Sequence, residues 1–289
     1  MVTTTVEIRL ITLLLITLVY AIYDVFNKRN VPNWFAYIAL VIGVVVLIVT
    51  NNARDIVYGG LIALLIGSLS YLLYRSGFLG GGDFFEFVTI ALILPVQATP
   101  LLGGIMQFNL PFILSVFIAT GYVTVWAIPL YYLVFAKKTE PKKVGVDRGS
   151  LAAGLALLIA YVVLYLIIDY YLGFNATGFF LMLIIAVPSA LILAYERLIN
   201  FRMVSYIYPK DLEEGDIIAI NLMTKRETQV FSKRAKHFER LATEIVMKEM
   251  SHIKRKLPVY RNSAPLAAFT FVGVVISLLV GNLLLYIVF

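Results

Sequence analysis

The stretch Gly80-Gly81-Gly82-Asp83 lies between two apolar runs, one ending at Tyr74 and the next beginning at Phe84. Apolar runs of this kind predict membrane-spanning helices, so the aspartate is expected at the edge of a membrane. Glycine allows backbone conformations that are closed to other residues, and it lets a second backbone approach closely. The stretch therefore predicts a carboxylate that is presented to a partner helix or to an extended peptide.

The composition requires an apolar solvent for most of the chain. Of the 289 residues, 61% are hydrophobic and 14% are charged, whereas soluble domains average about 25% charged residues. The chain has no cysteine, which excludes disulfides, thiol nucleophiles and thiolate zinc sites. The net charge of +7 indicates topology and contact with membrane lipids, and no nucleic acid is expected as a partner.

Apolar runs divide the chain into candidate membrane spans, each judged against the roughly 20 residues that a span requires. Eight such runs lie at 8–23, 34–49, 56–74, 84–100, 110–136, 151–172, 178–195 and 265–289. The fourth is the weakest, because it fades at prolines. The expected fold is an α-helical polytopic membrane protein, a bundle of about eight (six to eight) transmembrane helices with a small α+β cytoplasmic domain inserted before the last helix.

The expected domains follow from these runs. Residues 1–199 form the transmembrane catalytic bundle, including a basic loop at 137–150, and residues 263–289 form the last transmembrane helix. Between them, residues 200–262 are polar and predict the small cytoplasmic domain. Within it the sequence predicts two strands and one helix, at Met203–Tyr208, Ile217–Leu222 and Phe231–Ile253.

Basic residues predict the orientation of the bundle, because positive charge is enriched on the cytoplasmic side. They gather in alternate connections, and the segment 200–262 alone holds 13 of the 24 Lys and Arg residues. Alternate connections share one side of a membrane. The expected topology therefore places both termini outside and these connections in the cytoplasm. Asp24, which closes the first run, and Asp83 then lie on the same cytoplasmic face.

Asp24 and Asp83 form a candidate catalytic pair. Two carboxylates close together cannot both ionise easily, so one acid and one base coexist at neutral pH. The ionised member can take a proton from water, and the neutral member can protonate the peptide carbonyl or the leaving group. Taken singly, each has a simpler explanation: Asp24 as a helix-end charge near Lys28 and Arg29, and Asp83 as an acidic residue at a helix start.

Three other ionisable residues are candidates for a role in a site. Glu86 lies three residues after Asp83, on the same helical face, and either modulates the pair or is an interfacial charge. His237 and His252 lie in the polar segment without a spacing typical of metal ligands. No metal site and no cofactor are expected.

Two motifs resemble those of a known family. Tyr23-Asp24, followed by a basic hairpin that ends in Val31-Pro32-Asn33-Trp34, resembles the first motif of type IV prepilin peptidases. Gly80-Gly81-Gly82-Asp83 matches the Gly-x-Gly-Asp motif of these membrane aspartyl proteases, 59 residues after Asp24. The segments Leu212–Asp216 and Pro265–Phe269 resemble the C-terminal part of the archaeal branch, the preflagellin and prepilin peptidases.

The resemblance implies roles for individual residues. Asp24 and Asp83 would be the catalytic residues, and the glycines Gly80, Gly81 and Gly82 would form a loop that shapes the site. Possible modulators are Tyr23, Pro32, Asn33 and Glu86. The chain departs from the family in having Phe84-Phe85-Glu86 where relatives often have a lysine, and in its eight candidate spans against about six.

The implied function is that of a membrane-embedded aspartic endopeptidase. It would remove the short basic leader, a class III signal peptide, from prepilin or archaellin precursors of type IV pili or the archaellum, at the cytoplasmic face of the cell membrane. Its partners would be such a precursor and membrane lipids. Because the chain lacks the cysteine-rich insert usual in the bacterial branch, peptidase activity alone is expected.

Two alternatives stay open from the sequence. Presenilin and signal-peptide-peptidase relatives also pair Tyr-Asp with Gly-x-Gly-Asp, but on consecutive spans late in the chain, and Ala264-Pro265-Leu266 is not their Pro-Ala-Leu motif. A transporter coupled to protons or cations could also use Asp24 and Asp83, because carboxylates within membranes often bind such ions.

Overall fold

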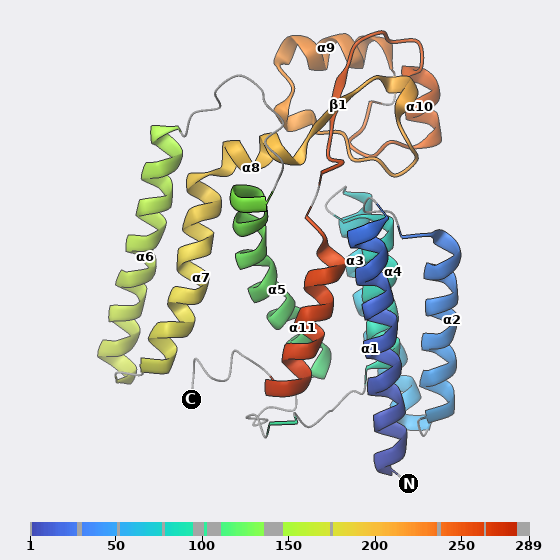
Figure 1. The fold of residues 1–289 in the computed structure, drawn as a ribbon, viewed down its shortest axis with the longest axis vertical. Coiled ribbons are helices and arrows are strands. Elements are labelled where there is room, and N and C mark those ends of the chain that lie inside the picture. Colours follow the sequence, from blue (N-terminus) through green and yellow to red (C-terminus); the bar gives the residue numbers. More distant parts are fainter. Residues whose placement is uncertain are drawn as a thin grey trace.

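Apolar helices form a bundle, and a small mixed domain lies across one end of it in this computed structural model (Figure 1). The structure describes residues 2–27, 31–50, 53–76, 79–94, 101–102, 111–135, 147–173, 176–235, 238–262 and 264–281. The bundle helices are α1 (Val2–Phe26), α2 (Asn33–Thr50), α3 (Ala53–Arg75), α4 (Gly81–Ile93), α5 (Phe112–Leu130), α6 (Arg148–Leu172), α7 (Ala176–Ala194) and α11 (Leu266–Val280). A π-helical turn, η1 (Tyr131–Phe135), continues α5.

Each apolar run of the sequence coincides with one of these helices, but their lengths differ. Within the described chain, four helices are long and apolar enough to cross a membrane: Thr5–Phe26, Ala53–Arg75, Phe112–Val134 and Arg148–Tyr171. A fifth span results if Met182–Ala194 and Glu196–Met203, which bend by 73°, are counted together. The expected helical membrane protein is therefore confirmed, whereas the expected number of eight spans is not.

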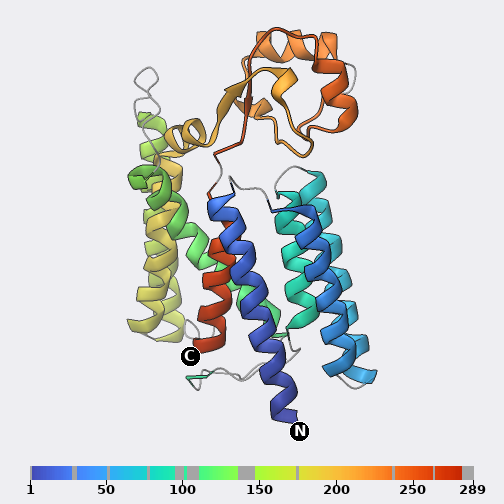
Figure 2. The same cartoon turned by 45° about the vertical axis from the view of Figure 1, so that its right-hand side comes forward.

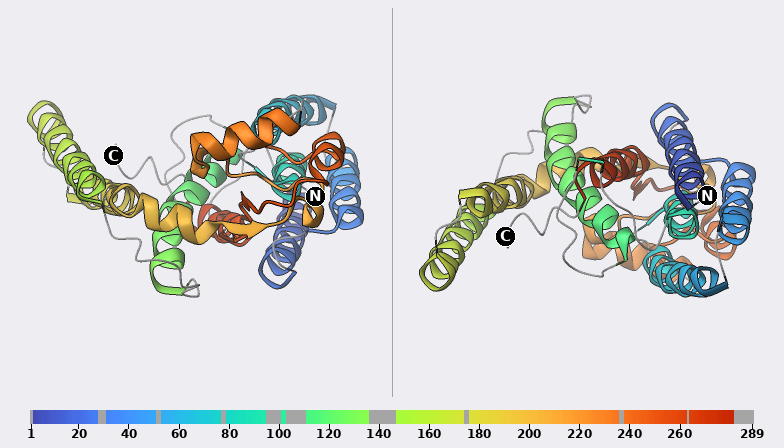
Figure 3. Two further views of the ribbon diagram at one scale, coloured as in Figure 1. Left: turned by 90° about the horizontal axis from the view of Figure 1, so that it is seen from above. Right: turned by 90° about the horizontal axis from the view of Figure 1, so that it is seen from below.

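The helices stand in a row when the bundle is viewed along its axis (Figure 3). Helices α1–α4 form one group, α5 and α11 lie in the middle, and α7 and α6 extend outward on the other side. Helix α11 packs on α1 and on α5, and so joins the group α1–α4 to the remaining helices of the bundle. At its crossing with α5, a Cβ on Gly273 would lie 2.6 Å from the backbone nitrogen of Thr120. A residue without a side chain is thus required for this close helix contact.

Helix α4 is the most enclosed helix of the first group, packed between α1, α2 and α3. At 13 residues it is about 20 Å long, shorter than the roughly 30 Å hydrocarbon core of a bilayer. Its C-terminal carbonyl groups are bound by the buried Arg9 of α1, whose Nε donates to Ile93 O at 2.6 Å and whose second amino group donates to Leu94 O at 2.7 Å. A cation at this end also complements the helix dipole.

Successive helices of the bundle run in opposite directions, so their starts alternate between its two ends (Figure 2). Helix α1 begins and α11 ends far from the domain, while the end of α1 and the start of α4 lie near it. Asp24 and Asp83 are therefore at the same end, as the alternation of the sequence predicted. Lys28, Arg29 and most of the basic loop 137–150 lie outside the described residues.

The small domain is entered through α8 (Glu196–Met203). Strand β1 (Ser205–Ile207) pairs antiparallel with β2 (Leu257–Val259), with Tyr206 opposite Pro258. The remaining elements are the 3₁₀ turns η2 (Pro209–Asp211) and η3 (Ile220–Leu222) and the helices α9 (Lys225–Arg234) and α10 (Glu244–Met250). The predicted α+β character of the segment agrees with these elements.

Two details of the domain differ from the sequence predictions. The predicted strand Ile217–Leu222 makes only isolated bridges, at Ile217 and Ile218, before it turns into η3. The predicted helix Phe231–Ile253 is wrong: α9 ends before Ala235, Leu241 forms an isolated bridge with Ile217, and Thr243 caps the start of α10. The helical spacing of apolar residues arose because residues of both helices and of the segment between them fill one core.

Arg261 fixes the turn that precedes this core. Its guanidinium binds the carboxylate of Asp216 at 2.7 Å and the carbonyl oxygen of Asp211 at 2.8 Å. The hydrogen bond to Asp216 raises the pKa of Arg261 above its ordinary value. Between Asp211 and Asp216 the chain turns at Gly215, whose φ of +91° lies in the left-handed region that favours glycine. The segment Leu212–Asp216 is thus a structural turn of the domain.

Candidate active site

Asp24 lies in the last turn of α1 and is buried. Its Oδ2 accepts a hydrogen bond at 2.9 Å from the main-chain N–H of Ala267, in the first turn of α11. The first N–H groups of a helix have no partner within the helix, and the helix dipole favours negative charge there. The start of α11 therefore holds the Asp24 carboxylate in place.

Asp83 is the third residue of α4 and so lies at the start of its own helix. Its Oδ2 accepts a hydrogen bond at 3.0 Å from the N–H of Gly80, the N-cap residue. The carboxylate thus folds back onto the beginning of its own helix, in the manner of a capping box. Each of the two predicted catalytic aspartates is bound by a main-chain N–H at the N-terminus of a helix.

The glycine run brings the two motifs together by close packing. Gly80 has φ −75° and ψ 161°, which other residues also adopt, and neither Gly81 nor Gly82 has positive φ. A Cβ on Gly82, however, would lie 3.1 Å from Cβ of Val31, in the connection between α1 and α2. Close approach, rather than an unusual backbone conformation, is what this structure requires of glycine here.

Asp24, Asp83 and Glu86 are close enough to interact electrostatically. Asp83 interacts with the charge of Asp24, and Glu86 interacts with the charges of both aspartates. The fold thus gathers two carboxylates separated by 59 residues, and it adds a third from the next turn of α4. The arrangement supplies the paired carboxylates that general acid–base hydrolysis requires.

Glu86 is fully buried, and neither of its carboxyl oxygens has a hydrogen-bond partner among the described residues. This burial excludes the interpretation of Glu86 as an interfacial charge. The neighbouring Tyr20 and Thr89 are also fully buried, and Tyr20 interacts electrostatically with Glu86. Sequence reasoning missed both, although Tyr20 precedes Asp24 by four residues and Thr89 follows Glu86 by three, which puts each pair on one helical face.

The other predicted modulators shape the connection between α1 and α2. The Tyr23 ring packs against those of Trp34 and Phe35, at centroid distances of 6.4 and 5.3 Å. The carbonyl of Pro32 accepts hydrogen bonds from the first turn of α2, and Asn33 is exposed at the start of that helix. These residues thus lie in or beside the connection whose Val31 packs against Gly82.

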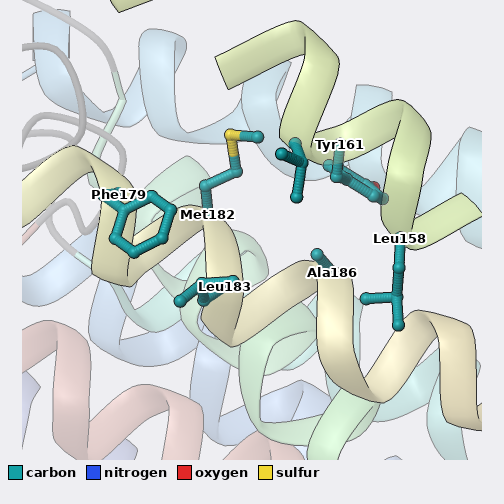
Figure 4. A pocket seen from close by; sticks show the side chains of 7 residues that line it. Leu158, Tyr161, Phe179, Met182, Leu183 and Ala186 are labelled. Atoms are coloured by element: carbon teal, nitrogen blue, oxygen red, sulfur yellow. The ribbon is translucent and has the colours of Figure 1, made fainter. Parts of the chain in front are cut away.

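Other places in the described chain offer less chemistry. No group of three or more His, Asp or Glu side chains in the described ranges is placed to hold a metal ion, and His237 lies outside those ranges. A small apolar cavity lies between α6 and α7 (Figure 4), lined by Val162 and by the labelled residues Leu158, Tyr161, Phe179, Met182, Leu183 and Ala186. None of the three carboxyl groups lines it.

The fold and the site define a helical membrane protein with a buried carboxyl cluster at one end of its bundle. Residues 11–130, which contain both aspartate motifs, match the family described as the type IV leader peptidase family. Over this segment the chain is similar to that family. Comparisons with curated proteins and with solved structures gave no match.

Proposed function

We propose that this protein is an aspartic endopeptidase in which Asp24 and Asp83 activate water against a peptide bond. The observation that carries the proposal is the electrostatic interaction of these two carboxylates, from the ends of two different helices. Both lie within the segment that matches the leader peptidase family. General acid–base catalysis requires one group that accepts a proton and another that returns one.

In this proposal Asp24 is the base and Asp83 the acid, although each is bound by a main-chain N–H at a helix start. Asp24 is bound by the N–H of Ala267 at the start of α11, which favours its ionised form. It therefore acts as the base that takes a proton from the attacking water. Asp83 stands on the glycine-lined start of α4 and gives a proton to the leaving amine nitrogen.

The substrate we propose is a precursor with a short basic leader followed by a hydrophobic helix, such as a prepilin or archaellin. The helix of the precursor would lie in the bilayer beside the bundle. Its leader would extend past the carboxylates, because a peptide bond within a helix is shielded from attack. The cut then falls just before the hydrophobic helix.

The cytoplasmic face of the cell membrane is the proposed site of cleavage. The carboxylates lie at the end of the bundle that carries the domain (Figure 1), and residues 200–262 hold 13 of the 24 Lys and Arg residues. Positive charge of this kind is retained in the cytoplasm and attracts anionic lipids. Both termini would then lie outside. The C-terminal motifs favour the archaeal branch of the family, and we propose no metal or cofactor.

A cleavage assay tests this function. Membranes containing the protein, its Asp24→Asn variant or its Asp83→Asn variant are mixed with a tagged prepilin, and the new N-terminus is sequenced. We expect one cut before the hydrophobic segment, lost in both variants. A cut within the hydrophobic segment would support the presenilin-like alternative, and proton flux without cleavage would support a transporter.

A further inference from the structure

A third carboxyl group lies beside the two aspartates, and the proposed mechanism does not use it. Glu86 is 0% exposed, and within the described chain its two oxygens are without a hydrogen-bond donor. An ionised carboxylate without a partner is costly to bury, whereas a neutral carboxylic acid costs far less. The burial of Glu86 therefore favours its protonated form.

The surroundings of Glu86 reinforce this assignment. The charges that act on it, those of Asp83 on its own helix and Asp24 on α1, are both negative. Tyr20, also on α1, interacts with Glu86 through a phenol hydroxyl, which carries no positive charge. The positive Arg9 binds the opposite end of α4, at Ile93 and beyond.

The other helices packed on α4 bring no cation toward Glu86. Helix α11 has no ionisable side chain in Leu266–Val280, and α2 has only Tyr37, whose ring packs on Phe85. On α3 the ionisable residues near the start of α4 are Tyr71 and Tyr74, whose rings pack on Phe84. Arg75, the last residue of α3, is exposed and is not among the charges that act on Glu86. Arg54, Asp55 and Tyr58 lie near the start of α3.

We propose that Glu86 holds the proton of this site and positions it for Asp83. The proposal rests on the proposed function. In the resting protein each aspartate accepts a main-chain N–H, which favours its ionised form, while Glu86, which has no such donor in the part of the chain that the structure describes, is neutral. The site therefore stores its one acidic proton on a group that does not touch substrate.

The proton balance of a turnover closes with this assignment. Asp24 takes one proton from water as the oxygen bonds to the peptide carbon. Glu86 passes its proton to Asp83, and Asp83 gives it to the amine nitrogen as the carbon–nitrogen bond breaks. The proton on Asp24 then returns to Glu86, so the three carboxyl groups end with the proton count with which they began.

Infrared spectroscopy tests the protonation of Glu86 without any cleavage. A neutral carboxylic acid has a carbonyl-stretch band that shifts in deuterated water and that ionised carboxylates lack. We expect this band in the wild-type protein at neutral pH and its loss in Glu86→Gln. Glu214→Gln, which changes an exposed carboxyl of the domain, should retain it. A wild-type spectrum without the band, or a band that survives Glu86→Gln, would overturn the proposal.

Cleavage kinetics test the use of the proton. Glu86→Gln keeps the size and polarity of the side chain, and we expect kcat at neutral pH to fall on the order of 10²-fold with KM unchanged. As the pH is lowered, solvent protonates Asp83 directly, so kcat of the variant should recover toward the wild-type value. Glu86→Asp should retain part of the activity with the wild-type pH profile. A loss in Glu86→Gln that is equal at all pH values would instead indicate a structural role and overturn the proposal.

The two experiments separate the failure of this inference from that of the proposed function. If the wild-type protein cleaves no leader, or Asp83→Asn still cleaves, the proposed function is wrong, and the mechanism for Glu86 falls with it. If Asp83→Asn is inactive while Glu86→Gln cleaves at the wild-type rate throughout the pH range, only the role of Glu86 is wrong.

Discussion

The carboxylate of Asp24 accepts a hydrogen bond from the main-chain N–H of Ala267, 243 residues further along the chain. Helix α11 starts at this bond, directly after the small domain. The exit of the domain is also tied to the bundle, because the Tyr132 hydroxyl donates to the carbonyl oxygen of Asn262 at 2.8 Å. The domain is therefore connected to the candidate site through a short segment held at both ends.

Substitution of Asp24 should separate catalysis from stability. Asp24→Asn keeps an oxygen that accepts the Ala267 N–H, so we expect loss of cleavage with little change in unfolding temperature. Asp24→Ala removes the acceptor and should lower the free energy of unfolding by about 1 kcal/mol as well. Thermal unfolding in detergent, paired with the cleavage assay, measures both. Equal stability of the two variants would show that the bond to Ala267 does not stabilise α11.

Gly82 should resist a side chain because of Val31. The added Cβ of Gly82→Ala would lie 3.1 Å from Cβ and 3.2 Å from Cγ2 of Val31, and we expect overpacking to cost about 1–3 kcal/mol. Gly81→Ala is the matched control, because its Cβ would lie at an ordinary 3.8 Å from Tyr74. It should not lower the unfolding temperature.

A double variant tests the cause of the Gly82 effect. Val31→Ala removes Cγ2 and gives the remaining Cβ room to shift. Combined with Gly82→Ala, it should cost less than the sum of the two single changes in unfolding measurements. Strict additivity would mean that these two motifs do not pack against each other.

Arg9 should stabilise α4 without taking part in the chemistry. Arg9→Met leaves the carbonyl groups of Ile93 and Leu94 without their charged donor, and we expect a loss of about 2–3 kcal/mol in the free energy of unfolding. Arg9→Lys, which keeps the charge but not the forked donor, should lose less. Because Arg9 binds the far end of α4, kcat measured well below the unfolding temperature should be retained. A fall in kcat without a loss of stability would contradict this assignment.

The start of α9 should weaken in acid. Thr224 donates its N–H and its hydroxyl to the Glu227 carboxylate, both at 2.8 Å, and these hydrogen bonds lower the pKa of Glu227. Because the folded pKa is below the unfolded value of about 4.3, this stabilisation is present above that value and is lost as the pH falls through the folded pKa.

Hydrogen exchange of the intact protein measures this effect. The protection factors of the α9 amides, corrected for intrinsic exchange at each pH, should fall below about pH 4. In Glu227→Gln they should be lower at neutral pH and should change less in acid. An identical acid dependence in the variant would assign the loss to other groups.

Much of the bundle was predictable because lipid imposes one solution on an apolar chain. Backbone N–H and C=O groups must be satisfied within each span, so apolar runs form helices. Every run of the sequence is accordingly a helix, and the ends of α2 and α6 lie within a few residues of those expected. The number of full spans was not predictable in this way, because α4 has only 13 residues. Its C-terminal carbonyl group at Ile93 is bound by Arg9 instead of by a further helical turn.

In the small domain, the helical spacing of apolar residues led to a wrong prediction. The spacing of Phe231, Ala235, Phe238, Ala242 and Ile245 suggested a continuous helix. Phe231, Ala235 and Ala242 are buried in one core, but Ile245 is exposed. Helix α9 nevertheless ends before Ala235, and the chain pairs at Leu241 with Ile217 before α10 begins. Strand pairing between distant segments decided this, and a local pattern holds no information about it.

The order of residues alone predicts the helical bundle, the family motifs and the placement of Asp24 and Asp83 at one end, because hydropathy and motif spacing are read directly along the chain. Three contacts are seen only in the folded protein: Asp24 binds Ala267, Gly82 packs on Val31, and Glu86 is buried near both aspartates. These contacts depend on how helices far apart in sequence pack, and burial, not residue type, made Glu86 a member of the site.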